Sequence, residues 1–283
     1  MIYGCEGNHG RRYVLLAIVL ACGLCAYATD PGKKKKKKKE EVVVIDDGLP
    51  HPDALPVPLT PQRPLDVEDD ELPTEVQVQH TPNHRLGGID VSHYQGSINW
   101  REVARSKEVN YVYIKATEGA QLVDNTYRTN LNAARRSGLK VGAYHFYRPN
   151  VSRQQQFQNM KANVSRWDMD LIPIIDVEHR GNEALHIFQN NLLNFLKMVE
   201  RHYGVRPIIY TSRDFYNKHL AGPFTHYKYM IARYHTDVPE LCDAAPFVMW
   251  QYTANGRVPG IRGNVDRSCF MDNYQLSDIL MPK

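Results

Sequence analysis

Cysteine is scarce in this chain of 283 residues, which has five. Three of them, Cys5, Cys22 and Cys25, lie close to the N-terminus, so only Cys242 and Cys269 belong to the remainder. Beyond residue 28, no Cys-x-x-Cys pair and no histidine cluster supports a metal site. We therefore expect neither a metal ion nor another cofactor. In an exported protein, an even pair of cysteines is compatible with one disulfide bond.

An apolar run long enough to cross a membrane is missing near the N-terminus. The stretch Val14–Leu24 is shorter than the roughly 20 residues that a spanning helix needs. Arg11-Arg12 precedes it and Ala26-Tyr27-Ala28 follows it, which is the order of a secretory signal with its cleavage site. We predict a signal over residues 1–28 and an exported protein that is periplasmic, attached to the cell envelope or secreted. An uncleaved membrane anchor and a lipid on Cys22 are the alternatives.

A surplus of positive charge is missing from most of the chain. The formal net charge is +4, but Lys33–Lys39 is an unbroken run of seven lysines. Removing these seven from the 35 basic residues leaves 28 against 31 acidic ones, a net charge of −3. Nucleic-acid binding is therefore not indicated. The lysine run either binds an anionic envelope polymer or membrane surface, or is a solvated spacer.

Periodic hydrophobicity is lacking from residue 29 to residue 83. This stretch holds the lysine run, acidic clusters such as Glu68–Glu71, and many prolines, among them Pro50, Pro56 and Pro58. Such a composition buries too little apolar surface to offset the entropy of ordering. We predict a flexible linker over residues 29–83, followed by one folded domain over residues 84–283.

Short apolar runs alternate with amphipathic stretches in the second part of the chain. We expect strands at 86–91, 110–116, 139–146, 171–178, 205–211, 227–232, 246–252 and 263–266, and helices at 98–106, 126–137, 154–166 and 182–203. The last three strands are joined by shorter connections. Strand–helix alternation over about 200 residues is typical of a parallel α/β barrel, a TIM-like fold.

The expected strand Leu171–Glu178 ends in two carboxylates one residue apart. Because the side-chain period of a strand is two, Asp176 and Glu178 should project from the same face. Neighbouring carboxylates raise each other's pKa at a cost in stability, which indicates a functional site. The alternative is a strand end that points two acids at water.

Acids and polar aromatic residues follow several other strands. In a barrel, the carboxyl ends of the strands form the active face, so dispersed groups at these ends can share one pocket. This convergence indicates an enzyme. The groups are Asp90, Glu118, Tyr144, Asp176, Glu178, Gln251, Tyr252 and Asp266.

Seven motifs in register resemble glycoside hydrolase family 25, the muramidases often called Chalaropsis-type lysozymes. They span roughly residues 85–280 and are Gly88–Trp100, Ile114–Gly119, Val141–Phe146, Ile175–Glu178, Pro207–Tyr210, Trp250–Tyr252 and Val265-Asp266. The resemblance implies an irregular (β/α)5(β)3 barrel. It also implies hydrolysis of the β-1,4 bond between N-acetylmuramic acid and N-acetylglucosamine in peptidoglycan. Met230 departs from the family pattern, where an aromatic residue is common.

The resemblance assigns roles to four carboxyl groups. Glu178 would be the general acid that protonates the leaving oxygen. Asp176 would stay ionised, either orienting the substrate's acetamido group for internal attack or acting as the nucleophile. Asp90 and Asp266 would support the site by hydrogen bonding or charge stabilisation, and nearby negative charge would raise the pKa of Glu178.

Aromatic side chains are the candidate surfaces for sugar rings. Tyr144, Tyr210, Trp250 and Tyr252 are the candidates, with core packing as the alternative for each, and Gln251 lies between the last two. Lys115 and Glu118 are expected to pair or to line the rim, whereas His145 is expected to be a core histidine.

The expected partner is therefore the glycan strand of peptidoglycan, bound by a monomer. Two other functions remain open: a non-catalytic glycan-binding barrel, and a tethered envelope protein in which the basic linker matters most.

Overall fold

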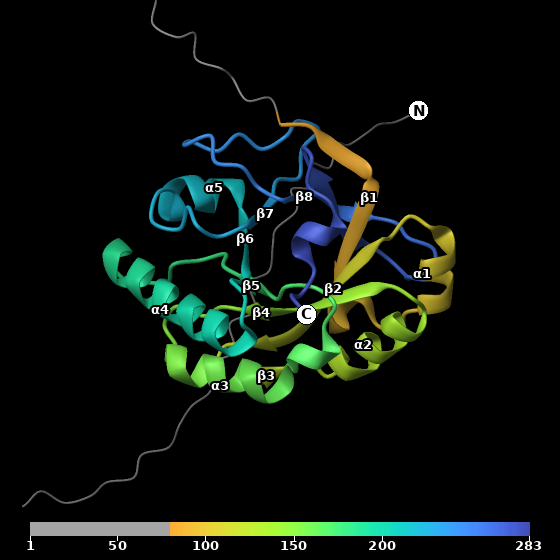
Figure 1. Cartoon of the computed structure of the whole chain (residues 1–283), viewed down its shortest axis with the longest axis horizontal. Helices are drawn as coiled ribbons and strands as arrows, with labels where there is room; N and C mark the ends of the chain where they lie inside the picture. The colour runs from red at the N-terminus through yellow and green to blue at the C-terminus, as the bar shows by residue number, and fades with distance from the viewer. Residues whose placement is uncertain (1–79) are drawn as a thin grey trace, which may run out of the picture. The chain divides into compact units, whose positions relative to one another are not determined.

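Eight strands close into a barrel in the computed structural model, which describes residues 80–283. Figure 1 shows the helices packed around the strands. The predicted signal, the lysine run and almost all of the predicted linker lie outside these residues. The barrel strands are β1 (Pro82–Val91), β2 (Tyr111–Glu118), β4 (Lys140–Phe146), β5 (Ile174–Asp176), β6 (Ile208–Ser212), β7 (Tyr229–Ala232), β8 (Met249–Gly256) and β9 (Val265–Met271). Each pairs with the next, and β1 closes the ring by pairing with both β2 and β9. A short strand, β3 (Leu122–Val123), forms a hairpin with β2.

One barrel strand runs against the others. Neighbouring strands are parallel from β1 through β8, whereas β9 is antiparallel to both β8 and β1. The start of β9 therefore lies at the same rim as the ends of the other strands. This rim is where barrel enzymes carry their active sites.

Helices follow the first five barrel units and then stop. They are α1 (Trp100–Ser106), α2 (Tyr127–Arg136), α3 (Arg153–Asn163), α4 (Leu185–Tyr203) and α5 (Arg213–Phe215), which continues into the π-helical turn η3 (Tyr216–Leu220). Short 3-10 turns are η1 (His93–Gln95), η2 (Arg166–Asp168) and η4 (Leu276–Ile279). In the described chain no helix separates β7 from β8 or β8 from β9. The predicted (β/α)5(β)3 barrel is confirmed.

The longest helix ends as the sequence predicts. Gly204 adopts a left-handed backbone with φ of 72°, and its N–H donates to the carbonyl of Glu200. The apolar residues that recur at helical spacing along it, Phe188, Leu192, Phe195, Leu196 and Val199, are fully buried, whereas Leu185 is 40% exposed. Leu185 is the first residue of α4, at the N-terminal end of the helix.

Aromatic side chains fill the barrel, which is a packed core and not a pore. Tyr111 and Tyr113 are almost completely buried, and their hydroxyls bond to Ser268 Oγ at 2.9 Å and to the carbonyl of Ile172 at 3.1 Å. Gly88 makes room for the first ring, since a Cβ there would lie 2.0 Å from the Tyr111 ring. A second apolar layer lies between the barrel and its helices.

The C-terminal segment closes the end of the barrel where the parallel strands begin. Ile279 of η4 is fully buried, and its carbonyl accepts the N–H of Ile172 at 2.8 Å. Leu171 and Leu280 form an isolated antiparallel bridge. Because this end is closed, access to the barrel interior is from the opposite rim.

Several boundaries differ from the prediction. The first strand begins at Pro82, four residues before Leu86, because Pro82 and Asn83 pair with the end of β9. The strand predicted over residues 171–178 is confined to Ile174–Asp176. Pro173 has no N–H for a ladder bond, which is consistent with a later start.

The possible disulfide bond is absent. Cys269 is buried on β9, whereas Cys242 is exposed in the connection between β7 and β8, and both are free thiols. The cysteine count could not reveal this, because pairing requires the two Cα atoms to lie within about 7 Å. In residues 80–283, no helix has the length and apolarity to cross a membrane.

Candidate active site

A pocket of about 230 Å³ opens at the carboxyl ends of the parallel strands. It gathers side chains from seven of the eight barrel strands and from the segments that follow them. Its lining is Asp90, Val91, Ser92, Tyr94, Gln95, Tyr113, Lys115, Tyr144, Phe146, Ile174, Asp176, Glu178, Tyr210, Met230, Tyr234 and Asp266. All four predicted catalytic carboxyls are therefore brought together.

Asp90 and Asp266 lie side by side on two adjacent strands. They are register partners in the antiparallel pair of β1 and β9. Desolvation and the negative charge of Asp266 raise the pKa of Asp90 well above its usual value. Desolvation also raises the pKa of Asp266, while a hydrogen bond from Asp90 opposes that rise. Asp90 therefore keeps a proton more readily, and Asp266 accepts from it.

Asp176 and Glu178 occupy different depths of the pocket. Asp176 is 7% exposed, and its Oδ1 has no hydrogen-bond partner among the described residues. Desolvation, the charge of Glu178 and the charge of Asp90 raise the pKa of Asp176. Glu178 is an exposed residue whose carboxyl reaches the pocket. Desolvation there raises its pKa as well, and Lys115 opposes the rise.

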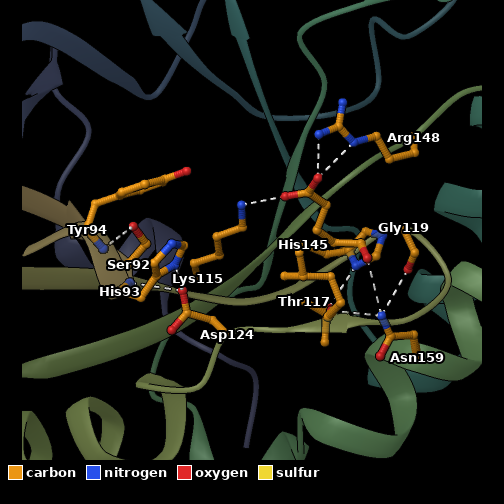
Figure 2. Close-up of polar contacts among 12 residues, drawn as sticks. Ser92, His93, Tyr94, Lys115, Thr117, Gly119, Asp124, His145, Arg148 and Asn159 are labelled. Carbon is orange, nitrogen blue, oxygen red and sulfur yellow. Dashed lines mark hydrogen bonds and ion pairs between the residues drawn. The ribbon is translucent and has the colours of Figure 1, made fainter. Parts of the chain in front are cut away.

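One ion-pair chain fixes the single cation of the pocket lining. Lys115 donates to Glu118 at 2.6 Å, and Glu118 also accepts from Arg148 (Figure 2). Arg148 donates to His179 Nε2 at 3.0 Å and lies over the ring of Phe146. Desolvation opposes ionisation of Glu118, but hydrogen bonds from both cations outweigh it and lower the pKa. Glu118 does not line the pocket itself. It supports the site as the ion-pair partner of Lys115 and Arg148.

Gln251 connects the acids to the tyrosines. It donates to Asp90 Oδ2 at 2.9 Å. Its carbonyl oxygen accepts from the hydroxyls of Tyr210 at 2.9 Å and Tyr234 at 2.8 Å. Burial and the nearby carboxyl charges raise the pKa of Tyr210 and of Tyr144. Both hydroxyls therefore stay protonated, the proton of Tyr210 is donated to Gln251, and both side chains line the pocket.

A tyrosine that the sequence analysis did not single out stands at the rim. Tyr94 is 81% exposed and stacks against His93 with ring centroids 4.1 Å apart. The turn that carries it is anchored by Asp124, which accepts from the backbone N–H and from Nδ1 of His93 (Figure 2). Tyr94 lies inside the first family-like motif, so its place in that motif was the available signal.

Two predicted sugar-binding residues face away from the pocket. Trp250 is 2% exposed and donates from its indole N–H to the carbonyl of Arg233. Tyr252 packs on Trp250 with ring centroids 5.8 Å apart and on His84. Strand alternation gives the reason, because Gln251 points inward and its two neighbours must point outward. Trp250 therefore belongs to the core, which was the alternative stated for it. Neither Trp250 nor Tyr252 lines the pocket.

The same alternation identifies Phe146, which was missed. Phe146 is two residues after Tyr144 on β4, and both line the pocket. His145 between them is fully buried and bonds Thr117 Oγ1 at 2.8 Å (Figure 2). Burial lowers its pKa to about 4, so it is a neutral core histidine, as predicted.

Metal ligation has no support in residues 80–283, where no group of three or more His, Cys, Asp or Glu side chains is arranged to hold an ion. The pocket instead places a proton-holding carboxyl beside a carboxyl that can ionise. That pairing suits general acid catalysis with stabilisation of a developing positive charge.

Comparison with known families agrees with this chemistry. The model of "Glycosyl hydrolases family 25" matches residues 89–261. The chain belongs to glycoside hydrolase family 25. It is thus a glycoside hydrolase, and Asp90, Asp176 and Glu178 fall within the matched segment.

Individual relatives and a solved structure cover most of this family 25 domain. The chain is 36% identical over 192 residues to the uncharacterized protein YegX of Escherichia coli K12, covering 66% of this chain and 70% of YegX. It is 32% identical over 212 residues to lysozyme M1 of Streptomyces globisporus, covering 70% and 72%. A family 25 glycosyl hydrolase structure from Bacillus anthracis superposes with a TM-score of 0.63 at 27% identity, covering 72% of this chain and 97% of that one.

Proposed function

We propose that this family 25 enzyme is a muramidase that hydrolyses peptidoglycan at the β-1,4 bond between N-acetylmuramic acid and N-acetylglucosamine. The observation that carries the proposal is the gathering of Asp90, Asp176, Glu178 and Asp266 around one open pocket. The similarity to lysozyme M1 supports a cell-wall glycan as the substrate class.

Glu178 is the proposed general acid. Its raised pKa keeps a proton on the carboxyl, and its exposed position allows contact with a glycosidic oxygen that enters from the rim. Protonation of that oxygen lets the bond break while positive charge develops on the sugar. The nearby charge of Asp266 contributes to holding the proton.

Asp176 is the proposed stabiliser of the intermediate. Its unpartnered Oδ1 is a hydrogen-bond acceptor that lacks a donor. The N–H of a substrate acetamido group supplies such a donor, and the bond would favour the ionised carboxylate despite its burial. The carboxylate then orients the acetamido oxygen for attack on the anomeric carbon. Direct attack by Asp176 on the anomeric carbon is the alternative. It would form a covalent glycosyl-enzyme intermediate, so labelling of Asp176 by a trapped sugar distinguishes the two mechanisms.

Asp90 and Asp266 are proposed to hold the opposite wall of the site. The proton on Asp90 links it to Asp266, and Gln251 fixes the other oxygen of Asp90. Tyr144 and Tyr210 present hydroxyls and ring faces to the sugar. Tyr94 at the rim adds an exposed aromatic face, the kind of surface on which a pyranose packs.

Mass spectrometry of a peptidoglycan digest tests the proposal. Fragments with N-acetylmuramic acid at the new reducing end are expected, and Glu178→Gln serves as the inactive control. Fragments that end in N-acetylglucosamine would assign a different bond. Retention of intact glycan on the protein without any new reducing ends would favour a glycan-binding barrel instead.

The proposed place of action is the cell envelope. The expected signal over residues 1–28 would export the chain, and Lys33–Lys39 would hold it near anionic wall or membrane polymer. Intact glycan strands are the proposed partner, acted on by a monomer.

A further inference from the structure

A second pocket lies beside the active site on the same rim, outside the ring of strands. It has a volume of about 380 Å³ and is formed by the segments that follow β4 and β5. Tyr147, at its base, directly follows Phe146 of the catalytic pocket, and its N–H donates to the carbonyl of Asp176 at 2.9 Å. The helices that begin here, α3 and α4, pack side by side (Figure 1).

Two oxygen atoms in this second pocket have no hydrogen-bond partner among the described residues. They are the hydroxyl of Tyr147, a residue that is 1% exposed, and Oε2 of Glu183. Burial and then the charge of Glu183 raise the pKa of Tyr147, whereas Arg153 lowers it, so both charges act at this hydroxyl. An unsatisfied buried polar group costs roughly 1–3 kcal/mol, and folded proteins keep few of them. A ligand with hydrogen-bond donors in this pocket would satisfy both atoms.

Opposite charges are held apart in this pocket. Asn191 accepts from Arg153 Nη1 at 2.9 Å and donates to Glu183 Oε1 at 3.1 Å. The amide therefore bridges the cation and the anion, which do not neutralise each other by direct contact. Guanidinium donors remain on one side and a carboxylate oxygen on the other.

The start of α3 adds positive potential on the Arg153 side, and the start of α4 follows directly after Glu183. The helix α3 begins at Arg153 and has 11 residues, and α4 begins at Leu185 and has 19. The N-cap of α4, Ala184, provides no side-chain hydrogen bond. Unpaired N–H groups at a helix start favour a carboxylate. Together with the unpartnered Tyr147 hydroxyl, this arrangement suits a ligand that carries both charges.

We propose that this second pocket binds an α-amino-acid zwitterion on the substrate. Its ammonium contacts Glu183 Oε2 and the Tyr147 hydroxyl, and its carboxylate contacts Arg153 and the start of a helix. The free end of a diamino acid in the wall peptide has this chemistry. The inference rests on the proposed muramidase function, because the muramic acid unit carries that peptide.

Two substrates prepared from one cell wall test the inference on the full chain. One keeps its peptides, and the other is stripped to bare glycan strands by an amidase. Wild type should have a KM about tenfold lower on the peptide-bearing strands, equal to about 1.4 kcal/mol. The KM on bare strands divided by the KM on peptide-bearing strands is therefore about ten in wild type. Glu183→Gln and Tyr147→Phe should bring this KM ratio close to one.

Matched controls come from the same chain. Tyr127 is also 1% exposed with an unpartnered hydroxyl, but it lies on α2 away from this pocket. Tyr127→Phe should leave the KM ratio unchanged, as should Glu240→Gln at an exposed position. A fall in the KM ratio in either control would overturn the assignment of peptide binding to the second pocket.

A binding measurement with free meso-diaminopimelic acid completes the test. Calorimetry should detect binding to wild type and its loss in Glu183→Gln. No binding together with equal KM values would overturn the inference while leaving the muramidase function intact. Binding with equal KM values would assign the pocket to a free amino acid and overturn the peptide assignment. Absence of turnover on both substrates would refute the proposed function, independently of the binding result.

Discussion

At the scale of single residues, two carboxyls one residue apart are separated by their surroundings. Asp176 is enclosed by the end of β5 and its neighbours, whereas Glu178 lies beyond the strand at the rim. Both pKa values are raised, and Lys115 opposes both shifts. The deeper group is placed to orient a bound sugar, and the outer group is placed to deliver a proton.

Replacing the proposed acid tests its role directly. Glu178→Gln should lower kcat on peptidoglycan by at least about 100-fold, because general acid catalysis contributes about that much or more. Release of reducing ends gives the rate, and circular dichroism checks the fold. Near-wild-type turnover would reject Glu178 as the acid.

Lys115 sets the pH range of the same group. Its charge lowers the pKa of Glu178, so Lys115→Met should raise that pKa further. The rate falls as pH rises through the pKa of the acid, which in wild type lies above 4.5. The alkaline limb of the kcat/KM profile should therefore move to higher pH in the variant. A limb that stays in place or moves to lower pH would contradict this assignment.

At the scale of elements, strand alternation decides which residues reach the pocket. On β8, Gln251 points inward and contacts Asp90, while Trp250 is buried on the outer side. On β1, Gly88 leaves the space that the Tyr111 ring occupies inside the barrel. A small residue on β1 thus makes room for a large ring from its register partner on β2, and the interior is filled.

Adding one methyl group inside the barrel should disturb this packing. Gly88→Ala places a Cβ 2.0 Å from the Tyr111 ring. Overpacking of this kind typically costs about 1–3 kcal/mol, to be measured by urea unfolding. In a Tyr111→Leu background the same substitution should cost less, because the clash is removed. Equal costs in both backgrounds would exclude the contact as the cause.

At the scale of the whole molecule, barrel closure concentrates negative charge in one buried place. Asp90 and Asp266 meet only because β1 pairs with β9, and Asp176 and Glu178 arrive from across the ring. Raised pKa values mean that the fold disfavours the ionised forms. The site therefore reduces stability at neutral pH.

The pH dependence of stability follows in sign. A carboxyl whose pKa is higher in the folded state loses stability as pH rises from the unfolded value, about 3.9 for Asp, through the folded value. Asp176→Asn removes this loss and should raise Tm at pH 7, by roughly 2–4 °C for each kcal/mol. Near pH 3 the two proteins should unfold at similar temperatures. A lower Tm at pH 7 would contradict the burial argument.

Removing the basic segment tests its contribution to turnover. Deletion of residues 29–79 should leave the rate on soluble glycan fragments nearly unchanged, because the catalytic pocket is lined by residues from 90 to 266. The deletion stops at 79 because His80 Nδ1 bonds Asp272 Oδ2 at 2.9 Å and β1 starts at Pro82. Loss of turnover on soluble fragments would favour the tethered-protein alternative. Binding to intact walls, measured by sedimentation, reports the role of the lysine run.

Much of the fold and part of the site were predictable from the residues. Strand–helix alternation is a local pattern, and so it predicted the barrel. The acids at strand ends were found because a barrel directs those ends to one rim. Tyr94 and Tyr234 were not predicted as site residues. Both lie just after a strand, in segments where the direction of the side chains follows no simple period.

The sequence by itself determined the order of elements and the chemical groups that each strand end carries, since both depend on neighbours along the chain. Tertiary structure alone decided that Asp266 joins Asp90, that Trp250 and Tyr252 turn away, and that the two free cysteines stay apart. Those outcomes depend on the antiparallel direction of β9 in the sheet and on which side chains of β8 point into the barrel. Both are set by pairing between strands distant in sequence, which a local pattern does not encode.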